Sequence, residues 1–177
     1  MKIAIIVCII LVILISIVIF CRINRNRFKF LIIKMDEALN AIDLHLQKKK
    51  ELFEKVRPIV AKELDTNDFL DYLENPLDLS QIEINDLYAR AYNELFKVID
   101  DNDNLLKNEE LSVIIDDINN NETDLLAAVK FYNDSAVIYN GLVSSFPAKI
   151  IAFLKRYKKR EFYNNEKRKI YDILNEE

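Results

Sequence analysis

The 177-residue chain contains one glycine and three prolines, a composition that favours long helices over a sheet and cannot build a glycine-rich phosphate loop. Its two cysteines, Cys8 and Cys21, lie in or beside an apolar amino-terminal run, which excludes a disulfide or a cysteine-based zinc site in the rest of the chain. The net charge is −4, but residues 1–30 carry five basic and no acidic side chains, so the remainder is strongly acidic and argues against a nucleic-acid groove.

An uninterrupted apolar run occupies residues 3–20, with Ser16 as its single hydroxyl side chain. A helix needs about 20 such residues to cross the hydrocarbon core of a bilayer, and this run just reaches that length. The small residues of a signal-peptidase site are missing where the run ends at Cys21 and Arg22. We therefore predict a retained transmembrane anchor over residues 1–22 that contacts membrane lipid through residues 3–20.

Basic residues flank this anchor unevenly. Arg22, Arg25, Arg27 and Lys29 follow it, whereas only Lys2 and the amino terminus precede it. The flank of a transmembrane helix that carries more positive charge stays in the cytoplasm. We therefore predict a single-pass protein of the cell membrane, with a cytoplasmic body and the amino terminus outside. The reverse orientation, with the body displayed outside, is the alternative.

The first helix of the body has an apolar seam of three- and four-residue steps, typical of a helix that packs side by side with partners. Pro58 lies within the seam and is expected to kink or break the helix. The seam contains Ile32, Met35, Leu39, Ile42, Leu46, Phe53, Val56 and Val60, with Lys49 as its polar interruption.

A polar connector with one short helical turn is predicted over residues 65–80, after which Ser80 and Glu83 have the spacing of a capping box. The second helix then carries an apolar stripe that ends at the Asp/Asn run of residues 100–104. The members of this stripe are Ile84, Leu87, Ala91, Leu95 and Val98.

A third helix is predicted from Asn108 to a stop at Pro147, with Glu122 on its seam. Its apolar members are Leu111, Ile115, Ile118, Leu125, Val129, Tyr132, Ala136, Tyr139, Val143 and Phe146. A fourth, basic helix is predicted from Ala148, with Ile151, Leu154, Phe162 and Ile170 as sparse apolar positions.

These elements predict an all-α fold. A single transmembrane helix over residues 1–22 precedes an antiparallel bundle of three long helices over residues 23–147. Residues 148–177 are expected to form a basic helix that packs on the bundle or extends from it.

Two ordered sequence blocks resemble the LemA family. The first block is an Ile-Asp-aliphatic pattern followed by basic residues and an acid-Leu pair, at residues 42–52. The second has a Glu before small and apolar residues, then two Tyr-Asn pairs seven residues apart and a Phe-Pro stop; these are Glu122, Tyr132-Asn133, Tyr139-Asn140 and Phe146-Pro147. The resemblance implies one membrane-spanning segment followed by a helical bundle, and it implies no particular chemistry.

The residues themselves give little sign of an enzyme. His45 is the single histidine, and no Glu-x-x-His motif of a di-iron bundle occurs. The acid pairs Asp100-Asp101 and Asp116-Asp117 lack the spacing and the bend glycine of a calcium loop. We therefore expect no enzymatic activity, catalytic residue, metal site, cofactor or small-molecule substrate, and we interpret His45 as a half-exposed bundle residue.

Glu122, Tyr132, Asn133, Tyr139 and Asn140 are the candidate site residues. They form either a binding surface of tyrosines and amides or a polar layer that sets the register of the helices. The second alternative is favoured, because polar groups on packing seams commonly set register and a carboxylate there must be paired. Lys48 and Lys49 of the first helix are the expected partners of Glu122.

The basic run of residues 155–160 has two readings. It binds anionic lipid, or it binds the acidic connector and second helix, within the chain or on another protein. In an up-down-up bundle Pro147 would lie about 50 Å from the bilayer, which favours the second reading. The function that follows is a membrane-anchored scaffold or adaptor with a protein partner and no nucleic acid. The alternative is a lipid-contacting or membrane-remodelling protein that acts through its basic carboxyl-terminal helix.

Overall fold

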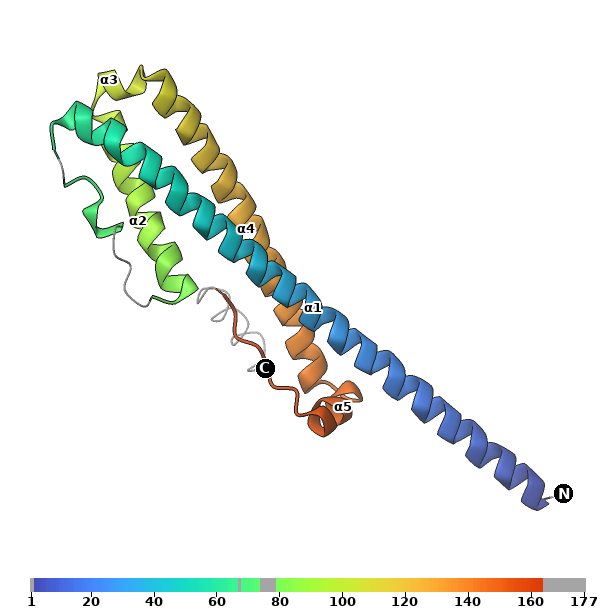
Figure 1. Ribbon diagram of the computed structural model, residues 1–177. Helices are drawn as coiled ribbons and strands as arrows, with labels where there is room; N and C mark the ends of the chain where they lie inside the picture. The colour runs from blue at the N-terminus through green and yellow to red at the C-terminus, as the bar shows by residue number, and fades with distance from the viewer. Residues whose placement is uncertain (1, 67, 74–78, 164–177) are drawn as a thin grey trace. The chain divides into compact units, whose positions relative to one another are not determined.

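The computed structural model describes residues 2–66, 68–73 and 79–163, and within these ranges the chain is helical with no strand (Figure 1). The helices are α1 (Lys2–Leu64), the 3₁₀ turn η1 (Asp71–Leu73), α2 (Gln81–Asp100), α3 (Asp103–Leu106), α4 (Glu109–Ser144) and α5 (Ala148–Lys155). The chain divides into two compact units. Ala38–Lys130 forms the central unit, and Met1–Glu37 with Phe131–Glu177 forms the terminal unit.

The core of the central unit is shared by α1, α2, α4 and the connector between α1 and α2. Helices α1 and α4 run in opposite directions here, since Asn104 just before α4 bonds Glu63 while Asn121 further along bonds His45. Buried apolar members of this core include Phe53, Val56, Val60, Phe69, Leu70, Leu87, Ala91, Leu95, Leu111 and Ile118.

Helix α2 runs parallel to α1, so the expected antiparallel arrangement of the first two long helices is wrong. Gln81 at the start of α2 donates a hydrogen bond to Asp43 of α1. Later in both helices, the ring of Tyr88 stacks on the ring of Phe53, so residue numbers rise in the same direction along α1 and α2. The connector makes this direction reachable because it folds back along α1, where Arg57 Nε donates to the carbonyl oxygen of Phe69 at 3.1 Å. Phe69 and Leu70 are buried, so the connector is part of the core and not a solvated turn.

Pro58 lies inside α1 and does not interrupt it, so the break, one of the two predicted effects, is wrong. The residue lies on the exposed face, where water can hydrate the carbonyl that loses its helical partner. The helix ends instead at Leu64, where Asp65 adopts a left-handed conformation with φ 50° and the Thr66 amide donates to the carbonyl of Ala61. That six-to-one bond is the signature of a Schellman cap.

The start of α2 confirms the capping-box prediction. The Ser80 hydroxyl accepts from the Glu83 amide, and the Glu83 carboxylate accepts from the Ser80 amide at 2.8 Å. These bonds lower the pKa of Glu83, because the Ser80 backbone and side chain both favour the ionised carboxylate. The predicted stripe is buried at Leu87, Ala91 and Leu95, with Tyr88 and Ile99 added to it.

In the terminal unit, α1 packs its buried face against α4. Phe28 of α1 lies edge-on to Tyr139 of α4, with ring centroids 5.7 Å apart. The face of α1 that is buried here starts at Asn24 and continues through Phe28, Leu31 and Met35. The seam therefore runs through Leu31 in place of the expected Ile32, which is only half-buried.

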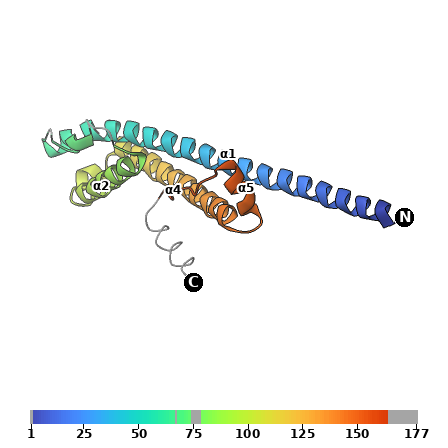
Figure 2. The same cartoon turned by 90° about the horizontal axis from the view of Figure 1, so that it is seen from below.

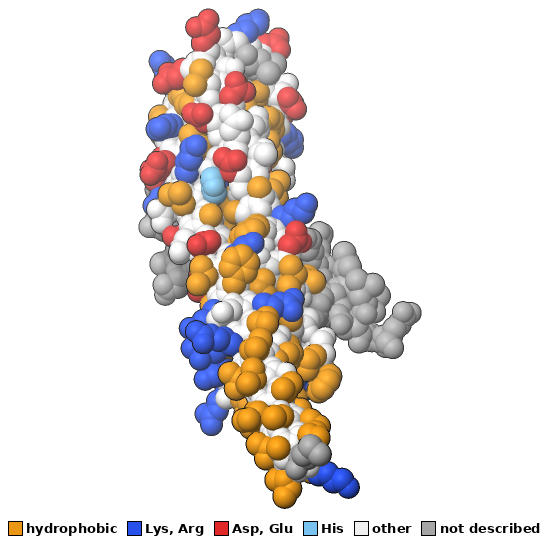
Figure 3. Space-filling model, turned by 90° about the vertical axis from the view of Figure 1, so that its right-hand side faces the viewer, with side chains coloured by type: hydrophobic (Ala, Val, Ile, Leu, Met, Phe, Trp, Pro, Cys, Tyr) orange, Lys and Arg blue, Asp and Glu red, His pale blue; other side chains and the backbone are white. Residues whose placement is uncertain are grey.

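The amino-terminal part of α1 is long and apolar enough to cross a membrane, judged by its length and composition. Its apolar side chains are exposed, and they cover the surface near the amino terminus (Figure 3). Figures 1 and 2 show α1 as one continuous helix, so no loop separates this apolar segment from the packed face that begins at Asn24.

Over the described residues 148–163, the basic helix expected over residues 148–177 is limited to one short segment. It begins at Ala148 and ends at Lys155, because Arg156 adopts a left-handed conformation with φ 55°. Residues 157–162 have no regular secondary structure, and the predicted apolar position Ile170 lies outside the described residues. Phe146, expected on the α4 seam, is exposed.

The predicted distance of Pro147 from the anchor is also wrong. Ile151 and Leu154 of α5 lie beside Val18 and Arg22, at the end of the apolar segment of α1. The error follows from the direction of α2. Because α2 runs parallel to α1, α4 is the returning helix and leads the chain back toward the anchor.

Candidate functional site

Glu122 pairs with the first helix of the central unit. Its carboxylate accepts a hydrogen bond from the Lys49 ammonium, in an ion pair between α4 and α1. Sequence reasoning named Lys48 and Lys49 as partners and expected Glu122 to be the buried group. The structure buries the lysine instead: the side chain of Lys49 is 1% exposed and that of Glu122 is 28% exposed.

One turn along α1, Asn121 joins the same two helices through both ends of its amide. Its Nδ2 donates to the backbone carbonyl of His45 at 2.9 Å. Because the backbone carbonyl of His45 can only accept, the Nδ2 of Asn121 must face it, and the Oδ1 of Asn121 faces the imidazole ring. The Oδ1 can only accept, so His45 Nδ1 donates to it at 2.9 Å. His45 is half-buried, as the sequence indicated, and the Nδ1–H tautomer serves a contact between helices.

The two Tyr-Asn pairs belong to the terminal unit, where they hold the segment after α5. Asn140 binds both backbone groups of Arg160: its Nδ2 donates to the Arg160 carbonyl at 2.9 Å, and its Oδ1 accepts from the Arg160 amide at 2.8 Å. The side chain thus replaces the backbone partners that a neighbouring strand would offer to an extended residue.

The second pair holds the same segment three residues further along. Asn133 Oδ1 accepts from the Tyr163 amide at 2.9 Å, and the Tyr132 hydroxyl donates to the Glu161 carbonyl at 2.9 Å. Seven helical residues rise about 10.5 Å. Three extended residues span about 10 Å. The seven-residue spacing of the two asparagines therefore matches the three-residue spacing of Arg160 and Tyr163, and the segment runs antiparallel to α4.

Aromatic rings complete this contact. Phe28 of α1 is fully buried, with Tyr139 on one side and the ring of Tyr157 4.9 Å away. Burial raises the pKa of Tyr132 and of Tyr139, while the Arg160 guanidinium opposes both shifts. Both phenols therefore remain neutral at physiological pH and serve as packing and hydrogen-bonding groups.

The five candidate residues do not form one cluster. Glu122 belongs to an ion pair of the central unit, whereas the Tyr-Asn pairs dock the basic segment within the terminal unit. Within the terminal unit the segment's partner is thus α4. The expected contact with the acidic connector and second helix, within the chain or on another protein, stays a prediction. Within the described ranges, no group of three or more His, Cys, Asp or Glu side chains could hold a metal ion.

Sequence reasoning missed Asn121 and Phe28. Asn121 is buried and lies one residue before Glu122, so the seam of α4 passes through the amide while the carboxylate lies at its edge. A signal existed for Phe28, because it continues the α1 seam at a spacing of seven residues before Met35.

An exposed aromatic groove lies on another face of the terminal unit. Phe30 of α1 and Phe131 of α4 are both exposed, and the Lys34 ammonium lies over both rings, 4.6 Å and 5.3 Å from their centroids. Together with Ile138 these side chains line a groove of about 330 Å³. The groove presents exposed apolar surface beside a positive charge.

Comparison with known proteins finds a family model, described as the LemA family, that matches residues 38–172. The match spans most of the chain and includes both blocks of the resemblance noted in the sequence. Neither a curated protein nor a solved structure matches the chain.

Proposed function

The chain belongs to the LemA family, and we propose that it is a membrane-anchored scaffold or adaptor whose body lies at the cytoplasmic face. The observation that carries this proposal is the continuity of α1. Exposed apolar residues before Phe20 pass into the packed face at Asn24 without a break in the helix. A body joined to its anchor in this way is held at the bilayer surface with no linker.

The polar residues of the chain support a structural role over catalysis. Lys49, Asn121, Asn133 and Asn140 are buried, and each is committed to a contact between elements. A catalytic group must be accessible to a substrate and free to exchange protons or ligands. We therefore propose that the protein is not an enzyme and takes no cofactor, small-molecule substrate or nucleic acid.

The aromatic groove is the proposed contact with a protein partner. Phe30, Phe131 and Ile138 offer apolar surface, and Lys34 beside them offers a positive charge. Aromatic and cationic groups of this kind are typical of the sites that dominate binding energy in protein interfaces. A partner helix with an apolar anchor residue next to a carboxylate would match this groove.

The test is capture from membranes of the full-length protein with a tag after Glu177, followed by the Phe30→Ser/Phe131→Ser variant. We expect the variant to lose a partner that the unmodified protein and a matched Val113→Ser control retain. Val113 is an exposed apolar residue of the central unit. Equal capture by all three proteins would reject the groove, and an enzymatic turnover by the purified protein would reject the adaptor.

The lipid-contacting alternative has one observation in its favour. Helix α5 lies beside the end of the apolar segment of α1 and exposes several large apolar side chains. A contact of α5 with lipid does not conflict with an adaptor role. The lipid contact and the adaptor role can therefore be tested in separate experiments.

A further inference from the structure

We infer that the cleft between α5 and α1 binds an anionic phospholipid, with α5 immersed in the membrane interface as a second membrane contact. The inference rests on the proposed anchoring of α1, but not on the adaptor role. The cleft has a volume of about 510 Å³ and is lined by Val18, Arg22, Arg25, Ile151, Leu154 and Lys155.

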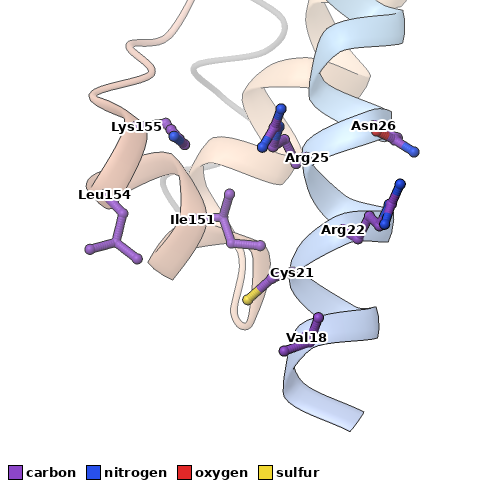
Figure 4. A pocket seen from close by; sticks show the side chains of 8 residues that line it. All are labelled: Val18, Cys21, Arg22, Arg25, Asn26, Ile151, Leu154 and Lys155. Atoms are coloured by element: carbon purple, nitrogen blue, oxygen red, sulfur yellow. The ribbon is translucent and has the colours of Figure 1, made fainter. Parts of the chain in front are cut away.

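The position of the cleft places it at headgroup level. Val18 lies within the apolar anchor, and Arg22 and Arg25 are the first charges that follow it. Figure 4 shows Val18 and Cys21 on the side of α1 that faces Ile151 of α5. When residues 3–20 cross the hydrocarbon core, the cleft therefore opens at the boundary between acyl chains and headgroups.

The direction of α5 suits a helix that lies in the interface. Helices α4 and α5 meet at an angle of 93°. In the terminal unit α4 runs antiparallel to α1, since Phe28 contacts Tyr139 and Lys34 contacts Phe131. Helix α5 thus runs roughly across the direction of the anchor, as interfacial helices do.

The exposed face of α5 carries large apolar side chains beside Lys149. Phe146, just before α5, and Phe153 within it are 82% and 83% exposed, and Ile150 and Leu154 extend the same surface. The opposite face is buried against the unit through Ala148, Ile151 and Ala152. A soluble surface with two fully exposed phenylalanines is costly, and immersion in acyl chains removes that cost.

Charge selects the lipid class. Residues 148–160 carry six basic and no acidic side chains, and Arg22, Arg25, Arg27 and Lys29 add four cations on α1 after the anchor. Arg22, Arg25 and Lys155 line the cleft together. Basic clusters beside a membrane helix attract anionic headgroups. Arg22, Arg25 and Lys155 would bind the phosphate, and Val18, Ile151 and Leu154 would contact the acyl chain.

The test uses the full chain, which lacks tryptophan, so that a Phe153→Trp variant has one tryptophan reporter. The variant is reconstituted into vesicles of phosphatidylcholine and phosphatidylglycerol, with bromine on the acyl chains of one lipid at a time. We expect blue-shifted emission, and severalfold stronger quenching by brominated phosphatidylglycerol than by brominated phosphatidylcholine at equal fractions. A Val113→Trp variant should show neither effect.

Replacing the cleft cations in the reporter background, as Arg22→Gln/Lys155→Gln, should make the two brominated lipids equally effective. A matched Lys107→Gln/Lys130→Gln change in the central unit should leave the preference intact. Vesicle flotation measures the anchor separately, so a protein that floats but is not quenched rejects the inference and leaves the anchoring intact.

Three further results would overturn the inference. Emission at position 153 that equals emission at position 113 would place α5 in water. A shift that disappears when the protein is diluted into excess lipid would mean that a second copy covers α5. Loss of the lipid preference on adding inorganic phosphate would identify the cleft as a site for free anions.

Discussion

The side-chain amide of Asn140 binds both the amide and the carbonyl of Arg160. Through this contact a helix holds a segment without regular secondary structure, and Asn133 adds a single bond, in which its Oδ1 accepts from the Tyr163 amide. The two Tyr-Asn pairs are thus a docking strip for the chain that follows α5. Helix α5 thus lies between the end of α4 at Ser144 and a segment that is docked on α4.

Asn140→Ala should release the segment around Arg160. Two hydrogen bonds of about 1 kcal/mol each are lost, which corresponds to roughly a thirtyfold rise in the open population. Trypsin should then cleave faster after Lys158, Lys159 and Arg160. An Asn120→Ala control, at an exposed position of α4, should cleave at the rate of the unmodified chain. Unchanged cleavage of the Asn140 variant would show that the bonds from Tyr132 and Asn133 and the ring contact of Phe28 with Tyr157 hold the segment without Asn140.

The orientation in the membrane should follow the charges after the anchor. A reporter that is active only in the cytoplasm, fused after Glu177, should be active. Neutralising Arg22, Arg25, Arg27 and Lys29 together should weaken or invert this result, because it removes the excess of positive charge on that flank. A silent reporter, with activity from a reporter of the translocated side, would reverse the assigned topology.

Local signals predicted the local features well. The Ser80–Glu83 capping box, the end of α2 at Asp100 and the apolar amino-terminal segment of α1 are decided by residues a few positions apart. The bonds of the capping box, for example, join Ser80 and Glu83, which lie within one turn of helix. The sequence signals for these features were accordingly specific.

The direction of α2 was not predictable in this way. It depends on the connector, where Phe69 and Leu70 find a place in the core and Arg57 bonds the Phe69 carbonyl. These contacts join residues more than ten positions apart, and helical periodicity carries no information about them. The docking role of Asn133 and Asn140 was hidden for the same reason, because their partners lie 20 to 30 residues downstream.

Stability at high pH should depend on Tyr88. Burial and the nearby Glu54 carboxylate raise the pKa of Tyr88 to about 12, against 10.0 for an ordinary tyrosine. The folded state thus holds the phenolic proton more tightly than the unfolded state, and the contribution present below pH 10 is lost as the pH rises toward 12. Tyr88→Phe, which keeps the ring stacked on Phe53, should lose less stability than the unmodified chain over this window in chemical unfolding. Parallel curves for the two proteins would contradict the shifted pKa.

The cap of α1 should be improved by glycine. Asp65 adopts a left-handed conformation that glycine occupies at no steric cost, and its negative charge lies at the negative end of the helix dipole. Asp65→Gly should therefore raise the free energy of unfolding by about 0.5–1 kcal/mol. Asp65→Ala removes the same charge, but alanine tolerates a left-handed conformation less well than aspartate does, so the two effects oppose each other and the variant should gain less than Asp65→Gly. An equal gain from both variants would assign the effect to charge alone.

The Lys49–Glu122 pair should respond unequally to the loss of each partner. Glu122→Leu leaves a buried ammonium without a counter-charge, and removing one member of a buried pair costs about 3–5 kcal/mol. Lys49→Met leaves a carboxylate that is 28% exposed and can be hydrated, so it should cost much less, about 1 kcal/mol or below.

The double variant Lys49→Met/Glu122→Leu separates the pair from the residues around it. Apolar replacement of a whole ion pair is often neutral or stabilising, so the double variant should recover most of the stability that Glu122→Leu loses. Chemical unfolding of all four proteins in the same detergent gives the coupling energy directly. A double variant as unstable as Glu122→Leu would mean that the leucine clashes with its surroundings. Equal stability of all four proteins would mean that the ion pair has no part in the register of α1 and α4, and Glu122 would then belong to the binding hypothesis.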